Sequence, residues 1–240
     1  PEMPPPPPSV PESPGLLAAA DRRQLALVVF AAAAFLFQLC NAAQLPLASI
    51  AVTATAGRLS GPLIAACVVV PQAVVALLSP RVGEAAEAFG RKWILVAGFA
   101  ALPLRALLFA LAPNAWLVVL VQVLDGVSAT VYGIMVPLIA ADLSRGTGRY
   151  NLVQGLIGLT GGLGATFSTS LAGLVADAAG TPVAFLGLAV VGAAAVALLV
   201  LAMPETRADA EAPGTPTERF PRPGKGSILR RSCRNHRGPP

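Results

Sequence analysis

The sequence predicts an all-α integral membrane protein with six transmembrane helices. Only 12% of its 240 residues are charged and 55% are apolar, whereas a soluble domain carries roughly a quarter charged residues. Long uncharged runs alternate with short segments that hold the charges. About 20 apolar residues in a helix suffice to cross a hydrocarbon core of roughly 30 Å, so each long run predicts one crossing.

The uncharged runs place the six spans at about 24–46, 61–80, 93–112, 115–139, 150–176 and 181–203. Prolines at 46, 71, 103 and 137 fall within them, which membrane helices tolerate because neighbouring groups satisfy the freed backbone. We expect three parts: a Pro-rich disordered leader at 1–20, a membrane domain at 21–206 and a basic disordered tail at 207–240.

Cysteine and histidine positions argue against an enzyme. Cys40 and Cys67 fall inside spans and Cys233 in the tail, so they describe no disulfide framework. The single histidine, His236, is also in the tail. An intramembrane serine protease would need a histidine base within the membrane, so we expect no enzyme, no cofactor and no bound metal. Paired Asn-Pro-Ala loops, typical of some channels, do not occur in the sequence.

Basic residues predict the orientation. With six crossings, fifteen of the seventeen Lys and Arg residues fall on one face; Arg58 lies on the other, and Arg105 lies within the third span. Basic residues concentrate on the cytoplasmic side of membrane proteins, so we expect both termini there. The abundance of Ala, Gly, Pro and Arg is typical of a GC-rich genome, and we expect the inner (plasma) membrane of a bacterium.

Ten residues between the second and third spans carry the most specific signal, Gly83-Glu-Ala-Ala-Glu-Ala-Phe-Gly-Arg-Lys92. The segment resembles the signature loop of the major facilitator superfamily, Gly-x-x-x-Asp-x-x-Gly-Arg-Lys. The matching residues are Gly83, Glu87, Gly90, Arg91 and Lys92, whereas Ala88 stands where the family usually has a basic residue. The plainer interpretation is a positively charged loop that only sets topology.

The resemblance implies a fold and a function. Family members have twelve helices in two six-helix halves, each built from two three-helix repeats, and they move small solutes by alternating access. The signature loop follows the second helix of a half on the cytoplasmic face and is thought to stabilise one conformation. On this interpretation the chain is the C-terminal half and residues 1–20 resemble the linker between halves. Its expected partners are the lipid bilayer, a small solute and an N-terminal half, not nucleic acid; the alternative is a fragment that transports nothing alone.

The fourth span matches the family only in part. Gln122 and Asp125 stand at the arginine and glutamine positions of the family pattern Arg-x-x-Gln-Gly-x-Gly-Ala. Because that arginine is implicated in proton coupling in parts of the family, the sequence does not support protons as the coupling ion. The substrate is equally open, since sugars, organic acids and amphiphilic drugs fit the same polar groups.

Arg105 and Asp125 are predicted to form an ion pair within the membrane. Counted from the turn at Pro113, they lie at depths of roughly 12 and 18 Å at the helical rise, a difference that an arginine side chain bridges. Ionisable groups at such depths are costly unless paired or facing water, and they indicate function. The pair is either structural or part of a gating or coupling network.

Polar side chains on four spans are candidates to line a cavity, as the family's first, second, fourth and fifth helices do. The candidates are Gln38, Asn41, Gln44, Gln72, Gln122 and Asp125, with Thr160, Ser168 and Ser170 as weaker ones. Gln38, Asn41 and Gln44 recur every three residues and would share one helix face. The alternative is that these groups hydrogen-bond between packed helices, at roughly 0.6 kcal/mol each.

The fifth span is rich in glycine. Gly158 and Gly162 have the Gly-x-x-x-Gly spacing at which membrane helices pack closely, and we expect them at a helix contact. The family's antiporter motif contains a Gly-Pro step, and no proline occurs here, so the segment does not support a drug/proton antiporter.

Overall fold

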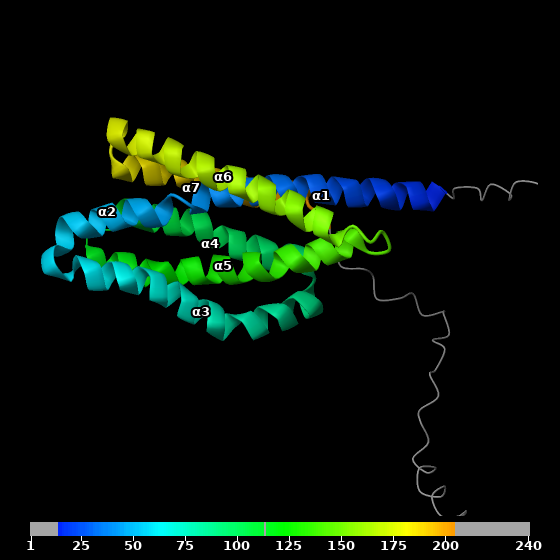
Figure 1. Cartoon of the computed structure of the whole chain (residues 1–240), viewed down its shortest axis with the longest axis horizontal. Helices are drawn as coiled ribbons and strands as arrows, with labels where there is room; N and C mark the ends of the chain where they lie inside the picture. Colours follow the sequence, from blue (N-terminus) through cyan, green and yellow to red (C-terminus); the bar gives the residue numbers. More distant parts are fainter. Residues whose placement is uncertain (1–13, 113, 205–240) are drawn as a thin grey trace, which may run out of the picture. The chain divides into compact units, whose positions relative to one another are not determined.

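Helices form nearly all of the chain that the structure describes. The structure, a computed structural model, describes residues 14–112 and 114–204, and these ranges contain no strand. The elements in chain order are α1 (Pro14–Asn41), α2 (Gln44–Ala56), the 3-10 turn η1 (Gly57–Leu59), α3 (Ser60–Phe89), α4 (Arg91–Leu111), α5 (Ala115–Ser144), α6 (Tyr150–Ala179) and α7 (Thr181–Ala202) (Figure 1). The all-α prediction is confirmed for these residues.

Five stretches of the described residues are long and apolar enough to cross a membrane, so the expected count of six is not confirmed. They are Arg22–Phe89, Arg91–Leu111, Ala115–Ser144, Tyr150–Ala179 and Thr181–Ala202. The difference lies in the first stretch, whose 68 residues contain both expected spans 24–46 and 61–80. Helical structure continues there because η1 leads directly from α2 into α3. Figure 1 shows α3 turning back past α2 to lie against α5.

The first expected span, 24–46, is not a single helix. α1 ends at Asn41 and α2 begins at Gln44. Pro46 has no N–H to donate to the carbonyl of Ala42, whereas a proline in the first turn of a new helix loses no bond. The chain therefore breaks at residues 42–43 and restarts as α2.

The predicted leader is partly helical. α1 begins at Pro14, so residues 14–20 belong to a helix and not to a disordered segment. Proline suits the start of a helix, and the Leu and Ala residues that follow have high helix propensity. Residues 1–13 and the predicted tail at 207–240 lie outside the described residues.

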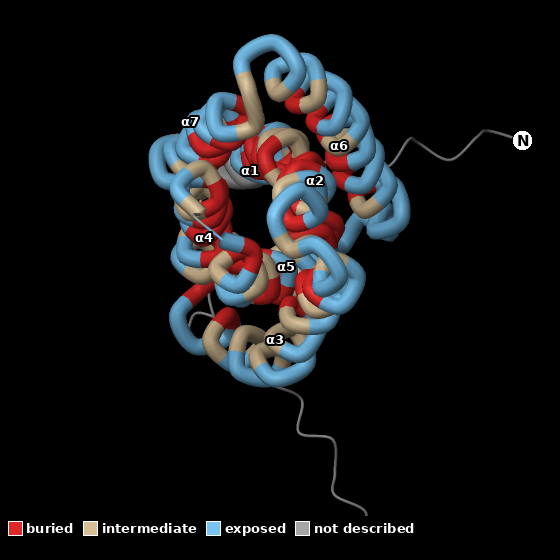
Figure 2. The backbone as a smooth tube through the Cα atoms, turned by 90° about the vertical axis from the view of Figure 1, so that its left-hand side faces the viewer, coloured by how far each residue is buried: buried red, intermediate tan, exposed pale blue. Residues whose placement is uncertain are grey.

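The helices pack as a bundle with an apolar outside. α1 packs against α6 and α7, α4 against α5 and α7, and α3 against α5. Buried residues lie on the faces that the helices turn towards one another (Figure 2). Phe37 of α1 stacks on Tyr132 of α5 with ring centroids 4.2 Å apart. Exposed residues such as Leu77 and Leu201 cover outer faces, as expected for a protein whose solvent is lipid.

Close helix contacts occur at glycines other than the expected pair. A Cβ on Gly164 of α6 would lie 2.3 Å from the carbonyl oxygen of Phe35 on α1, whereas one on Gly158 or Gly162 would meet nothing within 4 Å. The prediction for Gly158 and Gly162 is wrong within the described bundle. The spacing of glycines shows which face of a helix lacks side chains, but it does not show which face a neighbouring helix contacts. The face of α6 that contacts α1 contains Gly164.

Candidate functional site

A buried arginine connects three parts of the bundle. Arg105 of α4 is 1% exposed and forms an ion pair with Asp125 of α5. Its Nε donates a hydrogen bond to Oε1 of Gln44 at 2.7 Å, and its Nη2 donates to Oδ1 of Asn41 at 3.0 Å. A buried charge is tolerated when it is paired and hydrogen-bonded. One carboxylate and two amides together meet that requirement.

Asp125 is the accessible member of the pair. Its side chain is 21% exposed, against 1% for the side chain of Arg105. A carboxylate within a membrane-spanning helix is stable where it meets a cation or water and is costly in lipid. Asp125 is therefore the member of the pair that remains accessible from outside the bundle.

The break between α1 and α2 brings both amides to Arg105. Asn41 is the last residue of α1 and Gln44 the first of α2, so the expected single polar face does not run through this point. Ser168 of α6 stabilises the break, because its Oγ accepts a hydrogen bond from the backbone N–H of Ala43 at 3.0 Å. Gln44 Nε2 donates to the carbonyl of Cys40 at 3.0 Å. The break thus has partners on α4 and α6.

The other predicted cavity residues have different surroundings. Gln38 is half-buried and lies beside Gly161 of α6. Gln72 is exposed near the middle of α3. Gln122 of α5 is fully buried and faces the Cys67 thiol of α3, but neither its Oε1 nor its Nε2 has a partner in good hydrogen-bond geometry. The structure therefore does not gather these three amides around Arg105.

The weaker hydroxyl candidates on α6 divide in the same way. Thr160 and Ser170 bond carbonyls of their own helix, at Ile157 and Thr166. Ser168 alone among these three bonds another part of the chain, at the break. Of the three, only Ser168 belongs to the Arg105 surroundings.

The signature segment is mostly helical and not a loop. Gly83 and Glu87 lie within the last turns of α3, while Arg91 and Lys92 begin α4. Only Gly90 separates the two helices, with φ of 91°, a left-handed conformation that glycine adopts without strain. The segment is therefore a tight helix-to-helix corner that holds its charges in fixed positions.

Arg91 forms a second ionic cluster at this corner. Its side chain is 7% exposed, and its Nε lies 3.2 Å from Oδ2 of Asp142 on α5. Its Nη1 lies 2.8 Å from Oε1 of Glu87 and donates to the carbonyl of Ala86 at 3.0 Å. Arg145 also contacts Asp142, at 3.1 Å. The cluster joins the end of α3, the start of α4 and the end of α5.

Asp142 is a site residue that sequence reasoning did not identify. Its side chain is 5% exposed, whereas that of Glu87, which stands at the signature acidic position, is 62% exposed. The available signal was an acidic residue at the end of the fourth span, three residues before Arg145. Its pairing with Arg91 joins positions 51 residues apart and has no local pattern.

No metal centre is present in the described part of the chain, where no three His, Cys, Asp or Glu side chains come together. Cys40 and Cys67 are buried free thiols. Cys233 and His236 lie outside the described residues.

Comparison with known proteins identifies similar sequences over most of the chain. The family model described as Major Facilitator Superfamily matches residues 30–235. Two curated relatives, each named an uncharacterized MFS-type transporter and found in the CDC 1551 / Oshkosh and H37Rv strains of Mycobacterium tuberculosis, are 39% identical over 181 residues. These alignments cover 75% of this chain and 43% of each relative, so the chain spans less than half of their length. No solved structure matches the chain.

Proposed function

The chain belongs to the Major Facilitator Superfamily, and from that premise we propose that it forms half of a secondary transporter that moves a small solute by alternating access. It is an integral multi-pass membrane protein with apolar spans throughout its described residues. Because it spans 43% of the length of its relatives, we assign it to one six-helix half that acts together with a second half. The Pro-rich segment at 1–20, which resembles the linker between halves, favours the C-terminal half.

The observation that carries the proposal is the Arg105–Asp125 pair with its two amides. Structural stability alone does not require a buried ion pair in a membrane domain, since apolar residues of similar volume stabilise at least as well. Here the cation is sealed inside while the carboxylate stays partly exposed. That asymmetry suits a group that exchanges partners during a transport cycle.

The pair would work as a gate or coupling element. In the described conformation Arg105 holds α5 through Asp125 and the α1–α2 break through Asn41 and Gln44. A solute or ion that binds Asp125 weakens its attraction for Arg105, and the helices held by the pair then move more easily. Differences of a few kcal/mol suffice to shift such two-state equilibria.

A polar path for the solute would lie on helices that the second half covers. Gln72 is exposed in mid-α3, where contact with lipid is unfavourable. Gln122 is buried behind α3 with no partner for its amide, and it would become available when α3 and α5 separate. We assign both, with Gln38, Asn41, Gln44 and Asp125, to the cavity between the halves.

The Arg91 cluster would act at the cytoplasmic ends of the helices. Arg91, Asp142 and Glu87 join α3, α4 and α5 there. Opening the cavity on that side requires these ends to separate, so the ion pairs favour the conformation that is closed to the cytoplasm. We assign Gly83, Gly90 and Lys92 to the same gating corner because they stand at the matching positions of the signature segment.

The proposed topology has six crossings. α1 and α2 together form the first, α3 the second, and α4 to α7 the remaining four. Both termini and the Gly90 corner then face the cytoplasm, in agreement with the concentration of basic residues on that side. The membrane we assign is the inner membrane of a bacterium.

The test is transport by the chain in proteoliposomes, alone and together with the part of a Mycobacterium tuberculosis relative that it does not match. Labelled glucose, citrate and tetraphenylphosphonium represent sugars, organic acids and amphiphilic cations, and flux is measured with and without proton and sodium gradients. We expect flux of one class that Asp125→Asn abolishes. Flux that survives this variant unchanged would remove the assigned role of Asp125.

A second candidate is a membrane fragment that transports nothing without its partner half. The exposed Gln72 and the coverage of 43% of the relatives favour it. Flux by the chain alone excludes this candidate and also the proposed requirement for an N-terminal half. If the chain transports nothing by itself but transports a solute when the complementary segment is added, the result supports this candidate. The same result supports the proposed cavity between the halves.

A further inference from the structure

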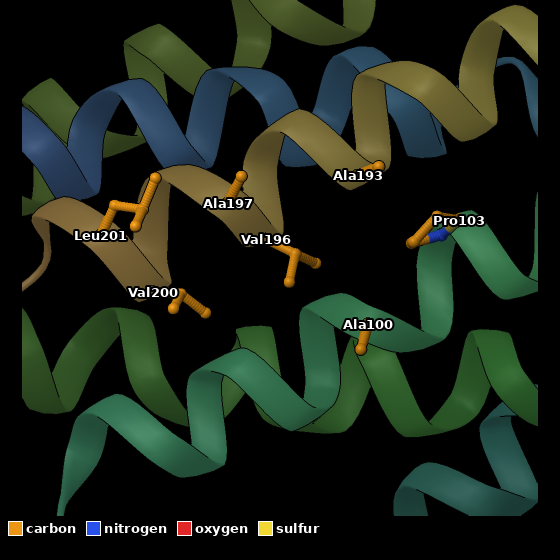
Figure 3. A pocket seen from close by; sticks show the side chains of 7 residues that line it. All are labelled: Ala100, Pro103, Ala193, Val196, Ala197, Val200 and Leu201. Atoms are coloured by element: carbon orange, nitrogen blue, oxygen red, sulfur yellow. The ribbon is translucent and has the colours of Figure 1, made fainter.

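An apolar groove runs along the outside of the bundle between α4 and α7. It has a volume of about 420 Å³, and its walls include Ala100 and Pro103 of α4 with Ala193, Ala197 and Val200 of α7 (Figure 3). The alanines leave room where larger residues would fill the space between the helices. Its walls are apolar side chains from end to end, so its occupant must be apolar along its length.

The length of the groove matches one leaflet of a bilayer. The α7 part of the lining runs from Ala193 to Leu201, and the eight residue steps between them correspond to about 12 Å at the helical rise. Half of a hydrocarbon core of roughly 30 Å is about 15 Å. Pro103 and Ala193 lie at one end of the groove and Val200 and Leu201 at the other (Figure 3).

A basic and an aromatic residue mark the end at Val200. Lys92 Nζ donates a hydrogen bond to the carbonyl of Val200 at 3.0 Å. Lys92 also lies 5.9 Å from the centre of the Trp93 ring, and Trp93 is 61% exposed. Lysine and tryptophan are typical of the membrane–water interface, where headgroups lie. The groove therefore extends from headgroup level towards the bilayer midplane.

The outer face formed by α4 and α7 lacks the exposed polar residues found on the faces that a second half would cover. Gln72 on α3 and Thr166 and Ser170 on α6 are exposed at mid-membrane positions, whereas the groove between α4 and α7 exposes only apolar side chains there. A partner for the groove is therefore hydrocarbon. Charge selects which lipid, because a positive side chain at the end of the groove is complementary to an anionic headgroup.

We propose that the α4–α7 groove binds one acyl chain of an anionic phospholipid whose phosphate lies beside Lys92. This site requires only that the chain spans a membrane, and it stands or falls independently of transport. The acyl chain fills a hollow that would otherwise forfeit dispersion contacts. The headgroup then lies next to the corner that holds the Arg91 cluster.

Photolabelling tests the proposal. The full chain is placed in lipid nanodiscs that contain phosphatidylglycerol with a diazirine midway along one acyl chain, or phosphatidylcholine with the same chain, and labelled peptides are identified by mass spectrometry. We expect labels from phosphatidylglycerol to concentrate on the α4 and α7 residues of the groove. Unlabelled phosphatidylglycerol should compete for them.

Matched variants separate binding from bulk contact. Ala197→Phe fills the groove and should remove most of the labelling, whereas Ala76→Phe, at an exposed position of α3 away from the groove, should leave it unchanged. Lys92→Gln should reduce the preference for phosphatidylglycerol over phosphatidylcholine about fivefold. If Ala197→Phe does not fold, competition by unlabelled lipid in the unaltered chain decides.

Three outcomes would overturn the proposal. The first is labelling spread evenly over all exposed helix faces. The second is equal labelling by both lipids in the unaltered chain. The third is loss of labelling when a second copy, or the complementary segment of a relative, is present, because a protein would then cover the groove.

Discussion

Arg91 and Asp142 form an ion pair that is buried on both sides: their side chains are 7% and 5% exposed, and Nε lies 3.2 Å from Oδ2. The pair joins the first residue of α4 to the last turn of α5. Glu87 also contacts Arg91, but its side chain is 62% exposed. How much Asp142 and Glu87 each contribute to stability therefore depends on how deeply each carboxylate is buried, and not on its place in the signature pattern.

Asp142→Asn should therefore destabilise the domain far more than Glu87→Gln. Removing one member of a buried pair costs up to about 3–5 kcal/mol, and somewhat less here because Arg91 keeps its contacts with Glu87 and the Ala86 carbonyl, whereas exposed pairs contribute up to about 1 kcal/mol. Stability is measured by thermal unfolding in detergent, followed through maleimide labelling of the buried Cys40 and Cys67 in a Cys233→Ser background. Equal losses for the two variants would contradict this ranking.

The Arg105–Asp125 pair should respond asymmetrically to substitution. Asp125→Asn leaves a guanidinium that is 1% exposed without its counterion, while Arg105→Met leaves a carboxylate that is 21% exposed and can gain water. We expect the first variant to be the less stable one and the double variant to recover part of the loss. The same unfolding assay gives all three values, and purely additive losses would indicate that the two side chains do not interact.

Ser168 should stabilise the break between α1 and α2. Its Oγ accepts the N–H of Ala43, and a buried N–H left without a partner costs about 1–3 kcal/mol. Ser168→Ala should lower the unfolding temperature, whereas Ser170→Ala, an exposed serine that bonds its own helix, should change it little. A similar small effect of both variants would mean that the backbone at the break finds another acceptor.

The sequence predicted what depends on composition and local pattern. Uncharged runs located the helices from α4 to α7 closely, and two isolated charges in apolar segments pointed to Arg105 and Asp125. The break at residues 42–43 was missed because Pro46 is compatible with either a kinked or an interrupted helix. Asp142 was missed because its partner is distant in sequence, and the packing face of α6 was misjudged because glycine spacing does not reveal which neighbour approaches.

Gln122 offers a test that separates stability from function. Its amide is fully buried without a hydrogen-bond partner in the structure, and such a group costs free energy in the folded state. Gln122→Met keeps a similar volume without the amide, so it should unfold at the same or a higher temperature. If the residue belongs to the transport cavity, the same variant should lower flux in the proteoliposome assay. A destabilised variant would show that the amide has a partner.

Two glycines two residues apart on α6, on opposite sides of the helix, give a matched pair for the helix contact. A Cβ on Gly164 would lie 2.3 Å from the carbonyl oxygen of Phe35, and backbone atoms cannot move aside cheaply. Gly164→Ala should therefore separate α6 from α1 and lower the unfolding temperature. Gly162→Ala meets nothing within 4 Å and should stabilise the helix by roughly 0.5–1 kcal/mol, since alanine has the higher helix propensity. If Gly162→Ala lowered the unfolding temperature more than Gly164→Ala, the helix contact would involve Gly162 and the Gly-x-x-x-Gly pair after all.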